Sequence, residues 1–580
     1  MVSVSRIRNG LCLMLSLYVG GGPLGQSVLA QAINLESVGK AKPIVVSGGL
    51  GANTIFSAGL PNADAPFNYF LSGNLNVNLF GTVNVPLSFN YSNRRIALSQ
   101  GYSFNQFSIS PTYKWITAHI GTNYMTFSPY TLNGHQFVGV GVEAAPGKWN
   151  VQAMAGRLLQ AQFTDTTTTG PTFRRMGYGL KVGYNPGNYL VGLTLFRAED
   201  DPSTVPPDRR RFQGQVVNPQ DNMVVSLNAG TTLFHALQLN AEYANSVITK
   251  DQSPEYDYLP VRSLAGVFVQ GNATSESYNA FKASANYNLA RTKTIVGVGY
   301  ERIDPNYTTL GGYYFVNDLT NYTLNLSQNL LAGKLQLSGN VGLQEDDIRR
   351  RKANRQSRFV GSLAANAQLS EGFNMGLNYS NFQSYRFLND TYSRLTRVPG
   401  QIIDTLAFSL VSQTLGYNLT KVLAKTDART AQLSFVATYV GSQSARANVV
   451  DASSLTRILN TSLTYSLGFP TRKASVNASL TYFRNALPTG TIQGVGPTLG
   501  VQKTFLQSLN TSLNLSALSV NNRLIAPTGT ESSTNSLALN AQLLANMRAG
   551  RHHAFNFMTG VVSTNVNTFV NGNLGYNFSF

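Results

Sequence analysis

Charged residues are scarce in this chain. Asp, Glu, Lys and Arg make up only 12% of the 580 residues, about half of their usual share in a soluble protein. Long apolar runs are also missing beyond the N-terminal segment, whereas a helical membrane protein needs stretches of about 20 apolar residues. These two absences exclude an ordinary soluble enzyme and a bundle of membrane helices.

Cysteine is nearly absent as well. The single Cys12 lies within the apolar stretch LCLMLSLYV, which follows Arg6 and Arg8 and precedes the small residues of SVLAQA. This order is typical of a secretory signal peptide that is cleaved after Ala30 or Ala32. The predicted mature chain then has no cysteine, so its stability depends on packing and backbone hydrogen bonds, without disulfides. The alternative interpretation of this segment is a buried N-terminal strand.

Apolar and polar residues alternate along most of the chain. One example is FNYFLSGNLNVNL, residues 67–79, which a short break separates from VNVPLSFNY, residues 83–91. An alternation of period two predicts a strand with one apolar and one polar face, and two such runs around a short break predict a hairpin. The unit recurs to the end of the chain and predicts about 26 strands, within a range of about 24 to 28.

The connections between the predicted strands alternate in length. The tight turns lie at residues 80–81, 114–115, 146–148, 185–187, 291–293, 333–334 and 471–473. The long connections lie at residues 198–221, 247–276, 346–357 and 383–404. Short turns at one end and long loops at the other are typical of an outer-membrane barrel.

These patterns predict an all-β fold, a single large antiparallel up-and-down transmembrane β-barrel with short periplasmic turns and long extracellular loops. Lipid cannot hydrogen-bond to the backbone, so a spanning sheet must close on itself, with apolar side chains toward lipid and polar ones toward the lumen. A soluble sandwich, the alternative, would not need the asymmetry of turns and loops. The predicted domains are the signal peptide (1–32), a short periplasmic segment (33–43) and the barrel (44–580).

Few residues in the predicted barrel are candidates for a site. Trp115 and Trp149 each follow a lysine at a tight turn, which predicts an interfacial aromatic girdle. Alternation places six charged or titratable side chains in the lumen: His119, Glu143, Lys181, Glu242, Lys282 and Glu301. A lumenal histidine could serve a hydrolase, but no partner is evident from the sequence spacing. We therefore expect no enzyme activity, no cofactor and no metal site.

The chain is basic, with a formal net charge of +18. A basic balance often indicates nucleic acid, but the export signal argues against it. Many of the basic residues lie in the short turns, where the phosphates of outer-membrane lipid and lipopolysaccharide would be their counterions. A positive surface without a specific partner is the alternative.

The sequence ends in GNLGYNFSF, an alternating strand with Leu574, Tyr576, Phe578 and Phe580 on its apolar face. Together with the signal peptide and the hairpins, this ending resembles bacterial outer-membrane β-barrel proteins. The resemblance implies a location in the cell outer membrane and an assembly signal at these four residues, which the barrel-assembly machinery reads. Residues 107–149 also resemble a group of Bacteroidota barrels of unassigned activity.

A barrel of about 26 strands is roughly 50 Å across, and an open hole of that width would destroy the permeability barrier. We therefore predict a channel or transport conduit that is constricted by extracellular loops or by a lumen-filling or periplasmic protein partner. The candidate constricting loops are residues 198–221, 247–276 and 383–404. The alternatives are a surface scaffold or adhesion barrel that displays these loops, and an outer-membrane enzyme.

Overall fold

A computed structural model describes residues 42–580 apart from 60–66, 94–105, 164–169, 213–214, 253–256, 314, 316, 347, 349–356, 388–406, 447–448, 451–453, 527–528 and 566. The predicted signal peptide and most of the predicted segment after it lie outside the described residues. The strands are β1 (Ile44–Ala58), β2 (Phe67–Leu79), β3 (Val83–Ser92), β4 (Gln106–Ile109), β5 (Thr112–Tyr113), β6 (Ile116–Thr126), β7 (Asn133–Ala144), β8 (Trp149–Leu159), β9 (Arg174–Tyr184), β10 (Tyr189–Asp201), β11 (Arg211–Phe212), β12 (Gln215–Val216), β13 (Asp221–Leu233), β14 (Leu237–Thr249), β15 (Tyr258–Leu259), β16 (Gly271–Asn272), β17 (Ser275–Leu289), β18 (Thr294–Ile303), β19 (Leu319–Leu330), β20 (Leu335–Asp346), β21 (Ser357–Ser370), β22 (Phe373–Phe387), β23 (Ala407–Lys425), β24 (Thr430–Arg446), β25 (Val449–Val450), β26 (Thr456–Phe469), β27 (Ala474–Leu487), β28 (Gly490–Phe505), β29 (Leu509–Ile525), β30 (Glu531–Ala549), β31 (His553–Ser563) and β32 (Thr568–Ser579). Short 3-10 helices are η2 (Pro202–Thr204), η3 (Pro207–Arg209), η4 (Ala265–Phe268), η5 (Leu331–Gly333) and η7 (Pro470–Arg472).

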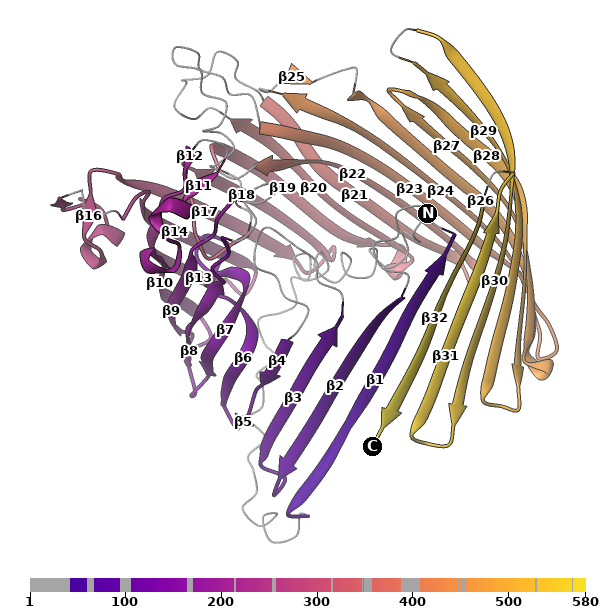
Figure 1. The fold of residues 1–580 in the computed structure, drawn as a ribbon, viewed down its shortest axis with the longest axis horizontal. Coiled ribbons are helices and arrows are strands. Elements are labelled where there is room, and N and C mark those ends of the chain that lie inside the picture. Colours follow the sequence, from indigo (N-terminus) through magenta and orange to yellow (C-terminus); the bar gives the residue numbers. More distant parts are fainter. Residues whose placement is uncertain are drawn as a thin grey trace.

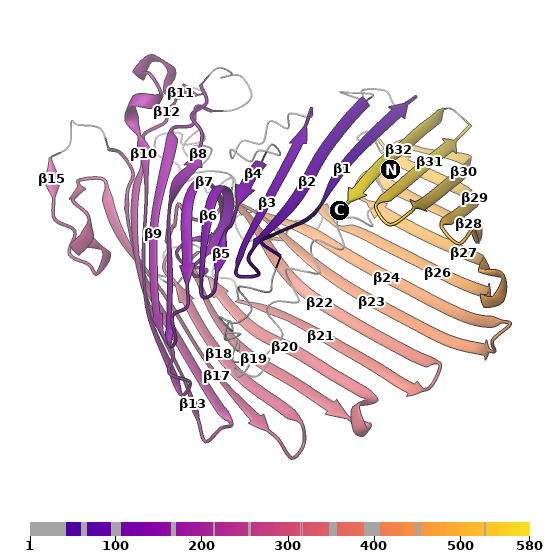
Figure 2. The same cartoon turned by 90° about the horizontal axis from the view of Figure 1, so that it is seen from below.

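The strands form one closed antiparallel barrel of 26 strands, which confirms the predicted fold. β4 and β5 share one position between β3 and β6, and β25 pairs only with the end of β24. The barrel closes where β1 and β32 pair antiparallel, residues 49–58 with residues 570–579, so that the two ends of the barrel sequence lie side by side (Figures 1 and 2). No sheet edge is left open at this seam, so the backbone groups of β1 and β32 have partners within the sheet.

The two ends of the barrel differ. At the turn end, consecutive strands are joined by short turns, and several turn residues adopt the left-handed conformation, such as Lys114 (φ 52°), Gly147 (φ 63°) and Lys473 (φ 47°). At the other end, the loop end, the connections are longer as far as β23. After β27 they become short there as well, with only Pro488 and Thr489 between β27 and β28.

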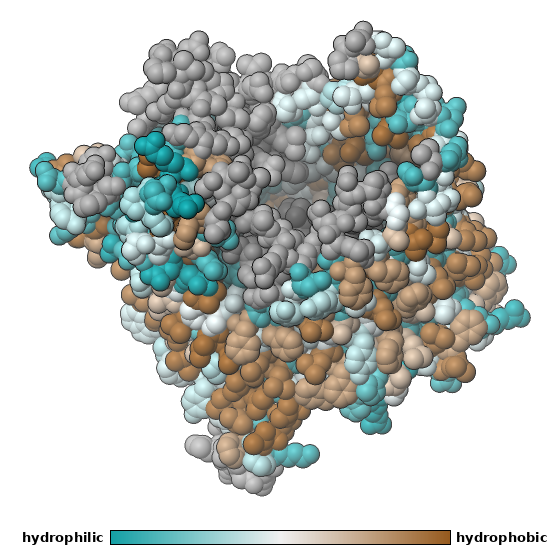
Figure 3. Space-filling view, viewed as in Figure 1, coloured by the Kyte–Doolittle hydropathy of each residue, from teal (hydrophilic) through white to brown (hydrophobic). Residues whose placement is uncertain are grey.

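The outward face of the barrel is apolar. Alternate side chains such as Val140, Leu324 and Leu499 are about half exposed on it, and Figure 3 shows mostly apolar residues over the lower part of one side, below the polar rim of the loop end. The nine residues of β17 from Phe281 to Leu289 are separated by eight steps, a rise of about 27 Å along the strand. With the tilt of the strand, this rise is near the ~25 Å apolar band of a membrane barrel. No helix among the described residues is long and apolar enough to cross a membrane.

Aromatic side chains border the outward apolar surface. Towards the loop end, Phe281 contacts Tyr300 and Tyr300 contacts Tyr322, with ring centroids 6.2 and 5.3 Å apart. Tyr243 lies opposite Phe281 in the β14–β17 register. We call these four residues the loop-end aromatic row. Its position defines the height at which the outer surface changes from apolar to polar.

Candidate functional site

Two connections at the loop end fold into the lumen and pack against its wall. They are residues 127–132, between β6 and β7, and the described residues of 304–318, between β18 and β19. We call the two segments the inner plug. Their apolar members, Phe127, Tyr130, Leu132, Tyr307 and Leu310, are all less than 8% exposed. The lumen of this barrel therefore contains a packed apolar core on one side.

The plug packs on side chains that point inward from the wall. These are Phe137, Met154, Leu158, Phe196, Ala198, Val224, Ala244, Ile248, Tyr278, Ala280, Ile303 and Leu319. They are apolar at positions where alternation would place polar residues facing water. The wall from β7 to β19 is thus adapted to hold the plug.

Hydrogen bonds hold the two plug segments to each other. The Tyr307 hydroxyl donates to the Tyr130 carbonyl at 2.9 Å, and the Thr309 hydroxyl donates to the Thr131 carbonyl at 2.7 Å. A Cβ atom added at Gly311 would lie 2.6 Å from the same Thr131 carbonyl oxygen. The fit between the segments therefore leaves no room for a side chain at Gly311.

Further hydrogen bonds hold the plug to the wall. The Leu310 N–H donates to Asn222 Oδ1 at 3.0 Å, and the Ser246 hydroxyl donates to the Thr308 carbonyl at 2.6 Å. Lys181 Nζ donates to the Phe127 carbonyl at 2.6 Å. Because these buried polar groups are paired, displacing the plug would leave several of them without partners, at a cost of about 1–3 kcal/mol each.

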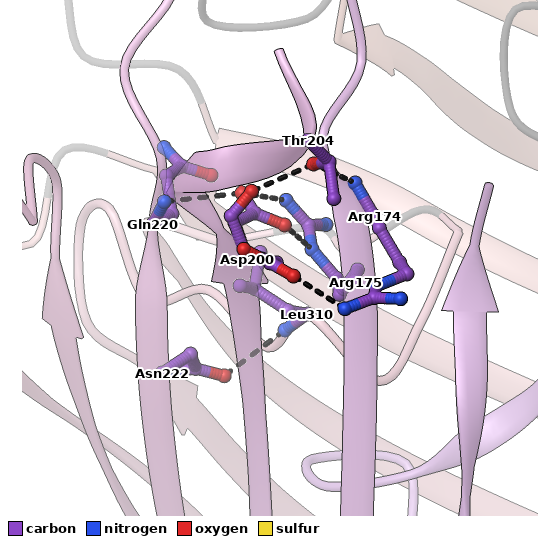
Figure 4. Close-up of polar contacts among 8 residues, drawn as sticks. Arg174, Arg175, Asp200, Thr204, Gln220, Asn222 and Leu310 are labelled. Atoms are coloured by element: carbon purple, nitrogen blue, oxygen red, sulfur yellow. Dashed lines mark hydrogen bonds and ion pairs between the residues drawn. The ribbon is translucent and has the colours of Figure 1, made fainter. Parts of the chain in front are cut away.

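A rim cluster of polar residues lies beside the plug at the loop end (Figure 4). Arg175 of β9 donates two hydrogen bonds to Asp200 of β10, at 2.8 and 3.0 Å. The Gln220 N–H donates to the same carboxylate at 3.0 Å, and the Asp200 side chain is only 3% exposed. Removing one member of such a buried pair is costly because the other charge stays buried. The cluster thus fixes the rim against which the plug is seated.

Three of the six predicted lumen residues lie side by side below the plug. Glu242, Lys282 and Glu301 are directly opposite one another in the register of β14, β17 and β18. The Tyr130 hydroxyl of the plug donates to Glu301 Oε1 at 2.5 Å. Burial, and then the carboxylate of Glu301, raises the pKa of Tyr130 well above its ordinary value, so its phenol remains a donor at physiological pH. The row formed by Glu242, Lys282 and Glu301 thereby holds the plug on the side that faces the turn end.

The other three predicted lumen residues also contact lumenal groups. Lys181 holds Phe127, as described above, and His119 lies 3.5 Å from Glu143 through Nε2 and Oε1. His119 Nδ1 is 3.1 Å from the Ser110 hydroxyl, a contact that the sequence spacing did not reveal. A serine, a histidine and a carboxylate are the groups of a hydrolase triad, but the His119–Glu143 separation is long for the hydrogen bond that would orient the imidazole.

The predicted girdle and assembly residues lie toward the turn end. Trp115 and Trp149 are about half exposed, and the Trp149 ring lies 4.8 Å from that of Tyr184. Phe578 and Phe580 stack with their centroids 5.5 Å apart. Phe580 exchanges two backbone hydrogen bonds with Gly48, at 2.8 and 2.9 Å, so the final residue is part of the seam. Leu574 and Tyr576 precede them on the outward face of β32.

The described residues of the predicted constricting loops are not part of the inner plug. In the 198–221 region, β10 continues to Asp201 and the connection forms η2, η3, β11 and β12 at the rim. The 247–276 prediction is wrong, because Val261, Ala265 and Val269 pack on outward side chains of β10, β13 and β14. In the 383–404 region β22 extends to Phe387, and residues 388–404 lie outside the described residues. Loop length was therefore a poor guide to which connections enter the lumen. The inner plug consists of two connections that are shorter than the predicted ones and are rich in buried apolar residues.

The opposite wall of the lumen has a different lining. Strands β26–β32 are described in full, and between Arg548 at the turn end and the loop end their inward positions carry no charged residue. One row across these strands, residues 477, 500, 514, 542, 560 and 571, reads Asn, Gly, Asn, Gln, Gly and Asn. None of the described residues in the apolar cluster that the plug forms with the wall belongs to these strands. Among the described residues, the inner plug therefore leaves this uncharged polar wall uncovered.

Residues that could hold a metal ion are not grouped in the part of the chain that the structure describes: no three His, Cys, Asp or Glu side chains come together there. No protein-family model and no curated protein sequence matches the chain.

Solved bacterial outer-membrane barrels have a similar overall form. The P pilus usher (PapC) translocation pore is 11% identical, with a TM-score of 0.38 and coverage of 93% of this chain and 99% of that one. The copper transporter OprC is 10% identical, with a TM-score of 0.38 and coverage of 93% and 80%. The anion-selective porin from Comamonas acidovorans is 13% identical, with a TM-score of 0.29 and coverage of 52% and 89%. Similarities this weak relate neither the sites nor the functions of these proteins to this chain.

Proposed function

We propose that this protein is an outer-membrane conduit for polar solutes, narrowed on one side by the inner plug. The observation that carries the proposal is the uncharged polar wall of β26–β32, which faces the lumen and is not covered by the plug. The inward Asn, Ser, Thr and Gln side chains of this wall hydrate well, and between Arg548 and the loop end it holds no fixed charge to select ions strongly. Such a lining suits neutral or weakly charged polar solutes.

The apolar outward face supports the membrane placement. Exposed Leu, Val and Phe side chains cover the outside of a closed sheet that has no unpaired edge at its seam, as a bilayer requires. By analogy with outer-membrane barrels, the turn end would face the periplasm and the loop end the cell exterior. We further propose that the signal peptide directs export, that residues 574–580 are read by the assembly machinery, that the basic turns meet lipid phosphates, and that the source is a Bacteroidota species. Non-enzymatic function is part of the same proposal.

Liposome swelling tests this function. We expect proteoliposomes to swell in isotonic solutions of small neutral sugars, because an uncharged polar wall offers no electrostatic barrier to them. Swelling should be slower for longer oligosaccharides, since the plug reduces the width of the lumen. Folding of the barrel would be verified by its heat-modifiable electrophoretic mobility. If the folded protein gave swelling no faster than that of protein-free liposomes, the conduit would be refuted.

A further inference from the structure

One connection at the loop end turns outward and lies on the outside of the barrel. We call residues 257–272 the outer finger; it contains β15, η4 and β16, which stand away from the wall in both views (Figures 1 and 2). Its inner side is anchored, because Ala265 is fully buried and its N–H donates to Asn245 Oδ1 of β14 at 2.8 Å. The finger is therefore fixed to the outer surface rather than free in solution.

The anchoring side of the finger is apolar. Val261, Ala265 and Val269 pack against four outward side chains of the wall, Leu195, Met223, Val225 and Val247. On a barrel strand these outward positions would otherwise contact lipid or water. The finger thus replaces that contact with protein over part of β10, β13 and β14.

The opposite side of the finger is apolar and uncovered. Tyr258 and Val267 are each 79% exposed, Leu259 is 51% exposed and Phe268 is 50% exposed. Four large, exposed apolar side chains on so short a segment form a patch of the kind that marks a site of contact with another apolar surface. Arg262 is exposed on the same finger.

The height of the finger indicates what this partner is. Asn245, which holds the finger, is two residues from Tyr243 of the loop-end aromatic row, about 7 Å along the strand. Further toward the loop end the same outer face becomes charged, with Arg197 paired to Asp221 at 3.1 Å. The exposed side chains of the finger therefore lie at the boundary between the apolar band and the water-facing rim.

The wall directly below the finger is shaped for lipid. Ala229, Ala241 and Ala283 are neighbours in the register and form the floor of an apolar trough of about 700 Å³, flanked by Val191 and Tyr300. Acyl chains packed in this trough would reach the foot of the finger. A membrane surface is thus continuous with the exposed patch.

We propose that the outer finger is an interfacial membrane anchor, with Tyr258, Leu259, Val267 and Phe268 inserted among the head groups and upper acyl chains of the loop-side leaflet. The finger carries one exposed cation, Arg262, and one exposed anion, Asp257, so its insertion would depend on the apolar residues and not on attraction to anionic lipid. This inference rests on the proposed membrane placement of the barrel. Insertion would fix the orientation of β10–β17 relative to the leaflet.

Electron paramagnetic resonance on single-cysteine variants tests the anchor. In a Cys12→Ser background, a spin label at Val267→Cys would be compared with labels at Leu499→Cys, on the outward band, and Asp208→Cys, whose side chain is 74% exposed at the rim. The protein would be reconstituted into vesicles of phosphatidylethanolamine and phosphatidylglycerol. We expect the Val267 label to collide severalfold more often with oxygen than with a water-soluble nickel chelate, as the Leu499 label does.

The controls separate this proposal from the proposed function. A Val267 label that behaves like the Asp208 label, while the Leu499 label is lipid-buried, would overturn the anchor alone. A Leu499 label that is also accessible to the nickel chelate would overturn the membrane placement itself. Shielding of the Val267 label from both reagents would indicate contact with another protein, and would likewise overturn the lipid anchor.

Discussion

Replacing residues 306–313 with a short Gly/Ser linker is expected to raise the single-channel conductance by about twofold or more, since conductance follows the open width of a pore. The change removes Tyr307, Leu310 and Gly311, which hold the two plug segments together and to the wall. Residues 127–132 then lose their contacts with the second plug segment and keep only those with the wall, such as the bonds from Lys181 and to Glu301. The measurement is the single-channel current of the purified protein in a planar bilayer.

A matched control is available on the other side of the wall. Residues 262–269 form a segment of equal length on the outer finger, which packs outside the barrel, so the same linker there should leave the conductance unchanged. Gly311→Ala should act in the same direction as the plug replacement, because its Cβ would collide with the Thr131 carbonyl. Equal conductance for the wild type and the 306–313 variant would show that the plug does not limit the current.

Removing residues 571–580 is expected to abolish the folded barrel. These residues carry most of the pairs that β32 makes with β1 and β31. Their loss would leave two strand edges in lipid, where each unpaired backbone group costs several kcal/mol, a total beyond the ~5–15 kcal/mol stability of a typical protein. The measurement is heat-modifiable mobility after refolding in detergent and in lipid.

A milder variant separates the seam from the proposed assembly signal. Phe580→Ala keeps the backbone bonds between residue 580 and Gly48, so we expect it to refold in vitro like the wild type. If the assembly machinery reads the aromatic terminus, the same variant should reach the outer membrane of cells in reduced amount. Efficient refolding of the 571–580 deletion would contradict the role of the seam.

The barrel could be predicted from the sequence because its strands obey local rules. In residues 67–79 and 83–91 the alternation and the break at Gly81 specify a hairpin without reference to the rest of the chain. Closure of the barrel could be predicted because an unpaired strand edge is costly in lipid. In the structure, the pairing of residues 49–58 with 570–579 closes the sheet.

The plug could not be predicted from loop length, because its seating depends on tertiary packing. The sequence nevertheless carried a local signal that β13 and β14 are covered on both their inward and their outward faces. Met223, Val224 and Val225 are consecutive apolar residues at the loop end of β13, and Val247 and Ile248 form a similar pair on β14. Such breaks in alternation indicate a strand buried on both sides. In the structure the inner plug covers Val224 and Ile248, and the outer finger covers the other three.

The central claim is that the current flows along the uncharged wall of β26–β32 and not along the plugged wall. Modification of single cysteines by a bulky, water-soluble thiol reagent during current recording tests it most directly, with Thr498→Cys on the uncharged wall and Val224→Cys under the plug. We predict that the reagent lowers the current of the Thr498→Cys protein and leaves that of the Val224→Cys protein unchanged. An unaffected Thr498→Cys current, or a block at Val224→Cys, would contradict the account.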